Sequence, residues 1–361
     1  MHDILKHFLL DSPSVSCEKY GNGHIHNTYL VVTEKQTPYI LQWINKGIFR
    51  DVPALMQNIV AVTEHLRTKV IPPLQVLTLI KTTQGEDYYT SPDDEYYRVY
   101  DFVQNSVCLE RAQQASDFAS SAVAFGQFQS MLSTFPAQTL HEIIPRFHDT
   151  PNRYSQLEQA IESDLAGRLQ TVAPEIAFAM ARKEEAGSLI ALRDKGHLPL
   201  RVTHNDTKLN NVLLCETDKT PLCVIDLDTV MPGLVANDFG DSIRFGASTG
   251  TEDETDLSKI SLSLPLFTCY TKGFLETCSA VLTDEEIKTL PMGAKLMTLE
   301  CGIRFLADYL NGDVYFHTSH ERHNLDRART QFKLVQDMEE KWETMEGIVH
   351  QLSKELGRDL Q

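Results

Sequence analysis

Residues 201–214, RVTHNDTKLNNVLL, strongly limit what this chain can fold into. The two ends, Arg-Val-Thr at 201–203 and Val-Leu-Leu at 212–214, predict short strands. The residues between these strands are mostly polar, among them His204, Asn205, Asp206, Asn210 and Asn211. Buried without hydrogen-bond partners, each such group would cost roughly 2–7 kcal/mol. The segment is therefore either a surface turn or a loop whose polar groups are held in place for chemistry.

The chain has 361 residues and a formal net charge of −17, from 50 acidic and 33 basic residues. This length allows two or three domains and a large hydrophobic core. A strongly negative surface repels nucleic-acid phosphates and anionic lipids, so we expect neither nucleic acid nor membrane as a partner. The apolar runs are also too short to span a bilayer. For the oligomeric state we expect a monomer.

The seven cysteines are scattered through the chain, and none forms a C-x-x-C pair. Such cysteines are typical of reduced proteins, where they act as small buried apolar groups. The N-terminal residues MHDILKHFLLDSP lack the basic start and the long apolar stretch of a secretory signal. We therefore expect a cytoplasmic location.

The first hundred residues have the pattern of a sheet. Two extended runs flank Asn22-Gly23, a dipeptide that favours a tight hairpin turn because both residues tolerate a positive φ. Residues 38–45 (PYILQWIN) and 95–104 (EYYRVYDFVQ) predict further strands. The spacing of apolar residues predicts a helix over 51–68.

From residue 105 onward the pattern is mostly helical, interrupted by two short strands at 211–215 and 222–226. The expected helices are 110–134, 152–171, 174–195, 237–246, 257–276, 284–312 and about 322–354. The change of composition divides the chain into an N-terminal unit, 1–104, and a C-terminal unit, 105–361.

Acidic and amide side chains follow the strand at 201–203 at a distinctive spacing. Asn211 comes five residues after Asp206, and Asp226 ends an apolar strand twenty residues after Asp206. Phosphoryl transfer needs a carboxylate that receives or orients the acceptor hydroxyl, and oxygen ligands for Mg²⁺ on the nucleotide phosphates. Asp206, Asn211 and Asp226 form that minimum set. Each alone would be explained as a turn residue, but chance produces the joint spacing much less often.

The strings HNDTKLNN (204–211) and IDLD (225–228) resemble the catalytic and metal motifs of the aminoglycoside phosphotransferase and choline kinase superfamily, relatives of the protein kinases. This resemblance implies an α+β, two-lobed, protein-kinase-like fold. Its N-lobe, 1–104, would be β-rich and bind the nucleotide. Its C-lobe, 105–361, would be mostly helical and carry the catalytic loop, the metal site and the acceptor site. The resemblance also implies a kinase that uses ATP and Mg²⁺.

The resemblance assigns a role to each residue of the two motifs. Asp206 would be the catalytic base, and Asn211 with Asp226 would hold Mg²⁺. Asp228 would be either a second metal ligand or a group that supports the ligands. Lys208 would touch the transferring phosphoryl group or would be a solvated loop lysine.

A literal D-F-G motif of the protein kinases begins at Asp238. It lies thirty-two residues after Asp206 and starts an expected helix, whereas Asp226 ends a strand at the expected spacing. We therefore expect Asp238 to cap that helix or to brace the catalytic loop. His204 is expected to tie the loop to neighbouring backbone.

The hairpin turn around Gly21 and Gly23 would cover the nucleotide phosphates, because glycine lets backbone N–H groups approach them closely. The resemblance places Gln42 where many kinases have a lysine for the α- and β-phosphates. A neutral amide supplies no charge, so we expect Mg²⁺ and Lys208 to compensate. Adenine would contact the strand that connects the lobes, at Tyr100, Asp101, Phe102 and Val103.

Longer strings, among them YGNGHIHNTYLV, FHDTP, DFGDSIRFGAST and ECGIRFLADYL, resemble the N-acetylhexosamine 1-kinases of this superfamily. That resemblance implies phosphate transfer from ATP to the anomeric hydroxyl of N-acetylglucosamine or N-acetylgalactosamine. Arg304 and Tyr315 would contact the sugar, although Arg304 taken alone is explained by an i,i+4 pair with Asp308. Further residues of the sugar site would be His24, Phe245 and His148.

Two alternatives stay open. A kinase for an amino alcohol or an aminoglycoside would suit the acidic surface, but it should have an acidic acceptor site, and Arg304 argues against that. A catalytically inactive, kinase-like binding protein is suggested only by Gln42.

Overall fold

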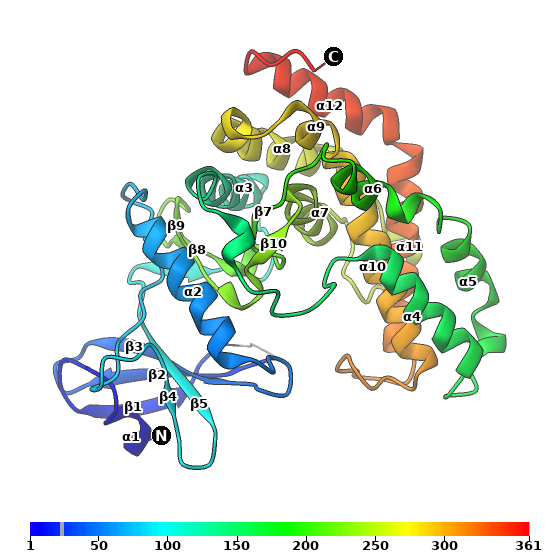
Figure 1. Cartoon of the computed structure of the whole chain (residues 1–361). Coiled ribbons are helices and arrows are strands. Elements are labelled where there is room, and N and C mark those ends of the chain that lie inside the picture. Colours follow the sequence, from blue (N-terminus) through cyan, green and yellow to red (C-terminus); the bar gives the residue numbers. More distant parts are fainter. Residues whose placement is uncertain (22–24, 361) are drawn as a thin grey trace.

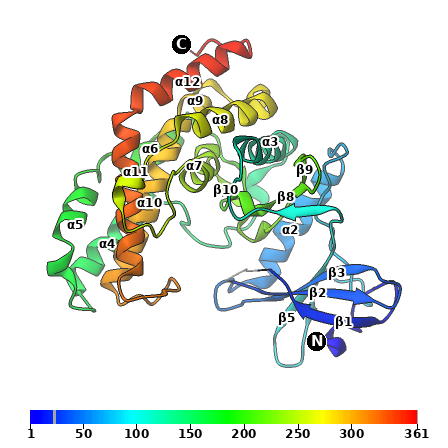
Figure 2. The ribbon, with the colours of Figure 1, turned by 180° about the vertical axis from the view of Figure 1, so that it is seen from behind.

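The computed structural model describes residues 1–21 and 25–360 of the chain. It has two lobes, a β-sheet N-lobe and a mainly helical C-lobe, which confirms the predicted fold class (Figure 1). In both views the N-terminal sheet lies at one end of the molecule, and helix α2 (Val52–Arg67) runs from it towards the C-lobe (Figure 2). Within these described ranges, no helix is long and apolar enough to cross a membrane.

The N-lobe is a five-stranded antiparallel sheet with the strand order β1-β2-β3-β5-β4. Its elements are α1 (His2–Leu5), β1 (Ser14–Lys19), β2 (Asn27–Thr33), β3 (Pro38–Ile44), β4 (Tyr89–Thr90) and β5 (Tyr96–Asp101). Phe8, from the N-terminal segment, packs in one buried cluster with Val31 and Leu41 of the sheet. The hairpin strands, β3 and β5 lie where the alternation of residues predicted them.

Helix α2 packs with the C-lobe, although it precedes the change of composition near residue 105. Its side chains Leu55 and Ile59 belong to the main hydrophobic core, together with residues of the C-lobe helices. The amide of Asn58 donates to the carbonyl oxygens of His141 at 2.8 Å and Val230 at 3.0 Å. The main core therefore contains residues from both sides of position 105.

The helices of the C-lobe are α3 (Ala115–Met131), α4 (Thr150–Ser163), α5 (Ala173–Met180), α6 (Ser188–Asp194), α7 (Val235–Gly246), α8 (Leu264–Cys278), α9 (Asp284–Lys288), α10 (Leu290–Leu310), α11 (His323–Glu340) and α12 (Trp342–Glu355). Three of the predicted long helices are broken. The segment 174–195 contains a turn between α5 and α6, 284–312 forms α9 and α10, and 322–354 is interrupted at Lys341. The prediction for 152–171 is too long because α4 ends at Asp164, which adopts a left-handed conformation.

Two small sheets bring the predicted site residues together. Strands β6 (Ser106–Cys108), β8 (Val212–Cys215) and β9 (Pro221–Val224) form one sheet, and β7 (Arg201–Thr203) with β10 (Met231–Gly233) forms the other. Strand β7 pairs with β10 and β8 pairs with β9, so the segments 204–211 and 225–230 are enclosed between the same two pairs of strands. This topology places the loop of Asp206 beside the segment of Asp226.

Helices α7 and α10 approach each other closely through glycine. A Cβ atom added to Gly293 would lie 2.0 Å from the backbone oxygen of Ala236, and one added to Gly240 would lie 2.2 Å from the oxygen of Gly293. Both obstacles are backbone atoms, which cannot rotate away as a side chain can. The absence of side chains at these two positions therefore sets the distance between α7 and α10.

We expect Gly293→Ala to destabilise the protein by about 1–3 kcal/mol or more, because the two helix backbones must separate. Gly347→Ala is the matched control, since Gly347 is exposed on α12 and an added Cβ would meet no atom within 4 Å. The control should be neutral or more stable by roughly 0.5–1 kcal/mol, because alanine favours a helix. Thermal unfolding followed by circular dichroism measures both effects, and equal melting temperatures for the two variants would contradict the expectation.

Candidate active site

Two aspartates of α7 anchor the loop that carries Asp206. The backbone N–H groups of His204 and Asn205 donate to the two carboxylate oxygens of Asp238, each at 2.8 Å. The N–H of Thr207 donates to Asp241 at 3.0 Å. The carboxylate of Asp238 thus braces the loop, one of the two roles expected for it, and makes no cap bond at the start of α7.

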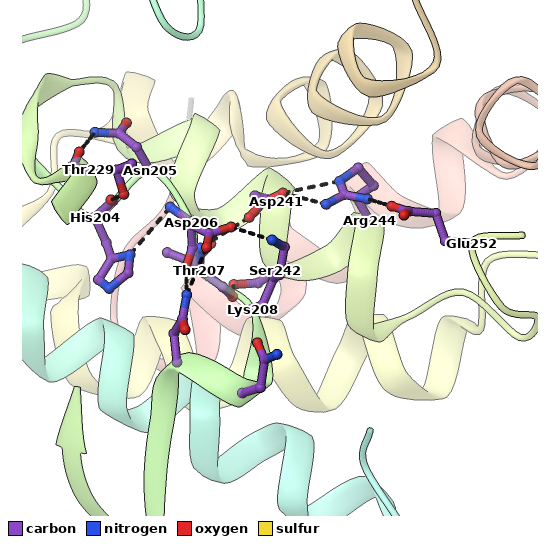
Figure 3. A network of polar contacts seen from close by, with 12 residues as sticks. His204, Asn205, Asp206, Thr207, Lys208, Thr229, Asp241, Ser242, Arg244 and Glu252 are labelled. Atoms are coloured by element: carbon purple, nitrogen blue, oxygen red, sulfur yellow. Dashed lines mark hydrogen bonds and ion pairs between the residues drawn. The ribbon is translucent and has the colours of Figure 1, made fainter. Parts of the chain in front are cut away.

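The network continues beyond Asp241 into the C-lobe (Figure 3). Arg244 donates to Asp241 at 2.9 Å and to Glu252 at 2.8 Å, and it is itself buried. The negative charge of Asp241 is therefore balanced by an arginine one helical turn away. The loop is fixed by charged groups that have partners of their own.

His204 is a structural residue of this loop. Its ring is fully buried between Phe125 and Phe128, and Nε2 lies 2.9 Å from the backbone oxygen of Ile225. The ring therefore ties the loop to the segment that leads into Asp226, as the sequence suggested.

Asp206 has two partners in its own loop. Lys208 Nζ lies 2.7 Å from Oδ1, and the Asn211 amide donates to Oδ2 at 2.9 Å and to the Asp206 backbone oxygen at 2.7 Å. Burial acts to raise the pKa of Asp206, but the charge and hydrogen bond of Lys208 outweigh it and lower the pKa. The carboxylate is therefore ionised at neutral pH and able to accept a proton or a hydrogen bond.

Asp226 stands next to this loop because of strand pairing. The N–H of Ile225 donates to the backbone oxygen of Asn211 at 2.9 Å, which extends the β8–β9 ladder to the residue before Asp226. Asp226 itself turns the chain with a φ of 60°. Surrounding protein, together with the negative charges of Asp228 and Asp206, raises the pKa of Asp226 well above the usual aspartate range. Asp226 is an exposed residue, and within the described ranges no basic side chain pairs with its carboxylate to balance these effects.

Asp228 has a different environment from Asp226. Its two oxygens each accept a hydrogen bond from Arg98 at 2.6 Å, and His26 Nε2 lies 3.3 Å from Oδ2. Both Asp228 and Arg98 are buried. Because both oxygens are engaged by Arg98, this geometry favours the alternative in which Asp228 supports the ligands rather than binding a metal itself.

Arg98 is the main site residue that sequence reasoning missed. It lies on β5 in the string YYRVYDF, as a charged residue on a strand whose next two residues, Val99 and Tyr100, are buried. A fully buried arginine needs a carboxylate partner. An arginine inside an apolar strand was therefore a usable signal, although its partner lies 130 residues away.

The nucleotide-side residues are only partly described. Gln42 lies on β3, where its amide donates to Thr28 at 3.2 Å and its oxygen accepts from Arg98 Nε at 2.9 Å. Gly21 has a positive φ of 73° and an open Cβ position. Gly23 and His24 lie outside the described residues.

The segment that connects the lobes runs past the β1–β2 hairpin. Tyr100 is paired within the sheet, and the N–H of Asp101 donates to Thr78 at 2.9 Å. Phe102 and Val103 follow the end of β5, with the Phe102 ring 6.1 Å from that of Tyr20. Of the four residues expected to contact adenine, these last two therefore lie beyond the sheet, beside the hairpin.

A pocket of about 560 Å³ lies between α4, α10 and the segment 311–316. Arg304 and Tyr315 both line it, together with Phe147 and Phe316. The Arg304 guanidinium lies 5.4–5.8 Å from the centres of the three aromatic rings. Within the described part of the chain, Arg304 forms no hydrogen bond or ion pair, so its N–H donors are available to a ligand.

Asp308 is not the partner of Arg304 that helical spacing suggested. Its carboxylate accepts hydrogen bonds from three successive backbone N–H groups, those of Val314, Tyr315 and Phe316, at 2.9–3.0 Å. The i,i+4 explanation of Arg304 is therefore wrong, because the carboxylate of Asp308 is used to shape the loop that carries Tyr315.

The two further residues expected at the sugar site do not line this pocket. His148 is buried, with Nε2 3.1 Å from the Asn205 oxygen and Nδ1 3.0 Å from Glu300. Through its two ring nitrogens His148 thus joins the Asp206 loop to α10. Phe245 is half-buried on α7. His148 does connect the pocket with the loop, because the preceding residue, Phe147, is part of the pocket wall.

A model of the phosphotransferase enzyme family (APH) matches residues 16–258. The chain belongs to the phosphotransferase enzyme family. The match spans the N-lobe sheet, the Asp206 loop and α7. Arg304 and Tyr315 lie beyond its end, so membership of the phosphotransferase family does not by itself identify the acceptor.

Three solved structures show the same fold. An aminoglycoside phosphotransferase from Alicyclobacillus acidocaldarius is 13% identical, with a TM-score of 0.61 and coverage of 99% of this chain and 96% of that one. An amicoumacin kinase in complex with AMP-PNP, Ca²⁺ and Ami is 15% identical, with a TM-score of 0.59 and coverage of 91% and 89%. A choline kinase from Cryptosporidium parvum is 13% identical, with a TM-score of 0.58 and coverage of 92% and 91%. At these identities the likeness establishes the fold alone.

The environments of Asp238 and Asp226 predict opposite effects of the same substitution on stability. Asp238→Asn places an NH₂ group against one of two buried backbone N–H groups, which should destabilise the protein by about 1–3 kcal/mol. Asp226→Asn removes a carboxylate whose pKa is raised by the surrounding protein and by the negative charge of Asp228, so stability at pH 7 should be unchanged or higher. Melting temperatures at pH 7 test the contrast, and a larger loss for Asp226→Asn would mean that the two environments are assigned wrongly.

Proposed function

We propose that this phosphotransferase is an ATP-dependent kinase that phosphorylates the anomeric hydroxyl of an N-acetylhexosamine, N-acetylglucosamine or N-acetylgalactosamine. The observation that carries the proposal is the pocket at Arg304: an arginine without polar partners among the described residues, surrounded by aromatic rings, one of which, Phe147, precedes the His148 that contacts the Asp206 loop. An aromatic wall suits the apolar face of a sugar ring, and guanidinium N–H groups suit hydroxyl or N-acetyl oxygens.

The nucleotide lies between the β1–β2 hairpin and the Asp206 loop, and adenine contacts the backbone near Phe102 and Val103. The complex of the amicoumacin kinase with AMP-PNP and Ca²⁺ supports the use of a nucleoside triphosphate with a divalent cation in this fold. In this chain we assign ATP and Mg²⁺ to these roles.

Asn211 and Asp226 are the residues that would hold Mg²⁺, and their chemistry fits the ion. The NH₂ group of Asn211 donates to Asp206, which leaves its side-chain oxygen available as a metal ligand. The raised pKa of Asp226 indicates a carboxylate that a cation would stabilise. Oxygen donors of this kind are the usual Mg²⁺ ligands. The bound ion would supply charge neutralisation on the transferring phosphoryl group.

Asp206 is the base of the transfer step. Its carboxylate accepts the proton of the anomeric hydroxyl while the sugar oxygen forms a bond to the γ-phosphorus of ATP. The bond from that phosphorus to the β,γ-bridging oxygen breaks, and ADP leaves. Lys208, 2.7 Å from Asp206, keeps the carboxylate ionised before transfer and stabilises charge on the phosphoryl group as it moves.

The pocket also bears on the alternative of an amino-alcohol or aminoglycoside acceptor. Two arginines, Arg153 and Arg304, line it, and its acidic residue, Asp308, is already engaged by loop N–H groups. A cationic acceptor would meet like charge in such a pocket, which is unfavourable in a partly buried site. The pocket therefore favours a neutral acceptor.

We further propose that the enzyme works as a cytoplasmic monomer. All seven cysteines are free thiols, and a reducing compartment keeps such thiols unpaired.

Asp206→Asn should lower kcat by about 10²–10⁴-fold, the range for loss of a positioned base. Nucleotide affinity should stay near that of the parent, because Asp206 is assigned to the acceptor hydroxyl. Asp218→Asn, at the exposed turn between β8 and β9, is the control and should keep the parental rate. A coupled ADP-release assay and calorimetry with AMP-PNP give the two quantities, and turnover within threefold of the parent would remove Asp206 from the role of base.

The acceptor assignment predicts a pattern across substrate analogues and one variant. A methyl glycoside of N-acetylglucosamine should not be phosphorylated, whereas the 6-deoxy sugar should remain a substrate with phosphate on the anomeric oxygen. Arg304→Ala should raise the acceptor KM by roughly 10–100-fold, the loss expected for hydrogen bonds to a charged group, with little change in the KM for ATP. Arg193→Ala, which breaks only a surface ion pair with Asp194, is the control.

Turnover together with phosphorus–proton NMR locates the new phosphate in these assays. Phosphorylation of the methyl glycoside would exclude anomeric transfer. Preferential turnover of choline, an amino alcohol or an aminoglycoside would favour the cationic-acceptor alternative.

A further inference from the structure

Asp228 connects the two lobes through a buried ion pair. It belongs to the short helix η5 (Leu227–Thr229) of the C-lobe, whereas Arg98 lies on β5 of the N-lobe. The two N–H···O distances are both 2.6 Å, and the side chains are 3% and 1% exposed. Two parallel hydrogen bonds of this kind fix both the orientation of the guanidinium and its distance from the carboxylate.

Arg98 is oriented from within the N-lobe sheet. It lies opposite Gln42 in the β3–β5 register, and its Nε donates to Gln42 Oε1 at 2.9 Å. The amide of Gln42 is in turn bonded to Thr28 on β2. Gln42, which stands where many kinases have a lysine, thus orients Arg98 on the adjacent strand. The positive charge of this part of the sheet is therefore carried by β5 instead of β3.

His26 adds a second contact from the N-lobe to the same carboxylate. Its Nδ1 accepts the backbone N–H of Asn45 at 3.1 Å, so in the neutral ring the proton is on Nε2, which faces Asp228 Oδ2 at 3.3 Å. His26 is buried and directly precedes β2. The segment that leads into β2 therefore lies in close contact with Asp228, which receives its hydrogen bonds from β5.

We propose that Arg98, His26 and Asp228 form an inter-lobe clamp that positions the N-lobe sheet relative to Asp226. Asp226 is two residues before Asp228 and has a fixed left-handed turn, so a constraint on Asp228 is transmitted to Asp226 through two residues of backbone. Arg98 is a positioning residue: it is buried and acts through Asp228. This inference rests on the proposed nucleotide site, but not on the identity of the acceptor.

The sequence suggested that Mg²⁺ and Lys208 compensate for the neutral Gln42, and the clamp gives Gln42 a further role. A lysine on β3 would offer one charge to the phosphates, whereas Arg98 uses its charge to hold an aspartate of the C-lobe in place. The buried pair is costly to desolvate, so removal of one partner leaves an uncompensated charge that favours separation of the lobes.

The test is binding of AMP-PNP at saturating Mg²⁺, measured by calorimetry on the full chain, because this readout requires no sugar. Arg98→Gln and Asp228→Asn should each weaken binding by about 10–100-fold, the usual effect of removing a group that orients a ligand site. The double variant should bind AMP-PNP no more weakly than the weaker-binding single variant, because both substitutions remove the same interaction. Arg98→Lys, which retains charge but cannot bind both oxygens in parallel, should bind better than Arg98→Gln.

Arg182→Gln is the matched control. Arg182 also forms a two-bond pair with a carboxylate, that of Glu339 at 2.6 and 2.9 Å, but within the C-lobe. This control should lower the melting temperature without a change in AMP-PNP affinity. The KM for the acceptor should stay within threefold of the parent in the clamp variants as well, which a general loss of structure would not allow. Should Arg98→Gln not fold, Arg98→Lys and Asp228→Asn provide the same comparison.

Two results would overturn the clamp. Parental affinity in folded Arg98→Gln or Arg98→Lys would show that the pair does not position the site. If Asp228→Asn alone raised the Mg²⁺ concentration needed for binding, with Arg98→Gln unaffected, Asp228 would be a metal ligand instead. Failure to phosphorylate N-acetylhexosamines would leave the binding result intact, so the two proposals fail separately.

Discussion

Asp238 accepts hydrogen bonds from two successive backbone N–H groups, those of His204 and Asn205, inside the C-lobe. Without an acceptor these groups could not be buried, because each unpaired N–H would cost free energy comparable to a lost hydrogen bond. Much of the C-lobe core is arranged to keep α7 at that place. Gly240 and Gly293 let α7 approach α10 backbone to backbone, and Gln129 of α3 adds a third donor to Asp238. The packing of α7 against α10 and its contact with α3 therefore fix the position of the Asp206 loop.

Strand pairing brings Asp206 of this loop close to Asp226 and Asp228, and the three aspartates have unlike electrostatic environments. Asp206 is paired with Lys208 and keeps a lowered pKa, whereas Asp228 is paired with Arg98 and its pKa is lowered well below the usual range despite burial. Asp226 lacks such a partner, and its pKa is raised. A base must be ionised before it can accept a proton, and a cation binds best where negative charge is uncompensated. The partners therefore suit the three carboxylates to different tasks.

Local sequence was sufficient for much of the fold because its signals act over short distances. The hairpin strands, β3, β5 and α2 follow from alternation and helical spacing, and Asp206, Asn211 and Asp226 follow from one motif with its spacing. Contacts between residues far apart in the sequence could not be predicted. The partner of Arg98 is 130 residues away, and Asp308 bonds a loop rather than Arg304. The prediction of long continuous helices was wrong for a related reason, because the apolar periodicity continues across the short turns that separate α5 from α6 and α11 from α12.

The proposed acceptor pocket is separated along the chain from the residues proposed for phosphoryl transfer. The family match ends at residue 258, whereas Arg304 and Tyr315 lie on α10 and the segment after it. His148 joins the two parts, with one nitrogen near the Asn205 oxygen and the other near Glu300 on the same helix as Arg304. Burial of His148 opposes its protonation, but the Glu300 hydrogen bond and charge outweigh this and raise its pKa. A charged pair at this junction would hold α10 against the catalytic loop, so a change in the acceptor pocket can alter the substrate while the geometry around Asp206 is preserved.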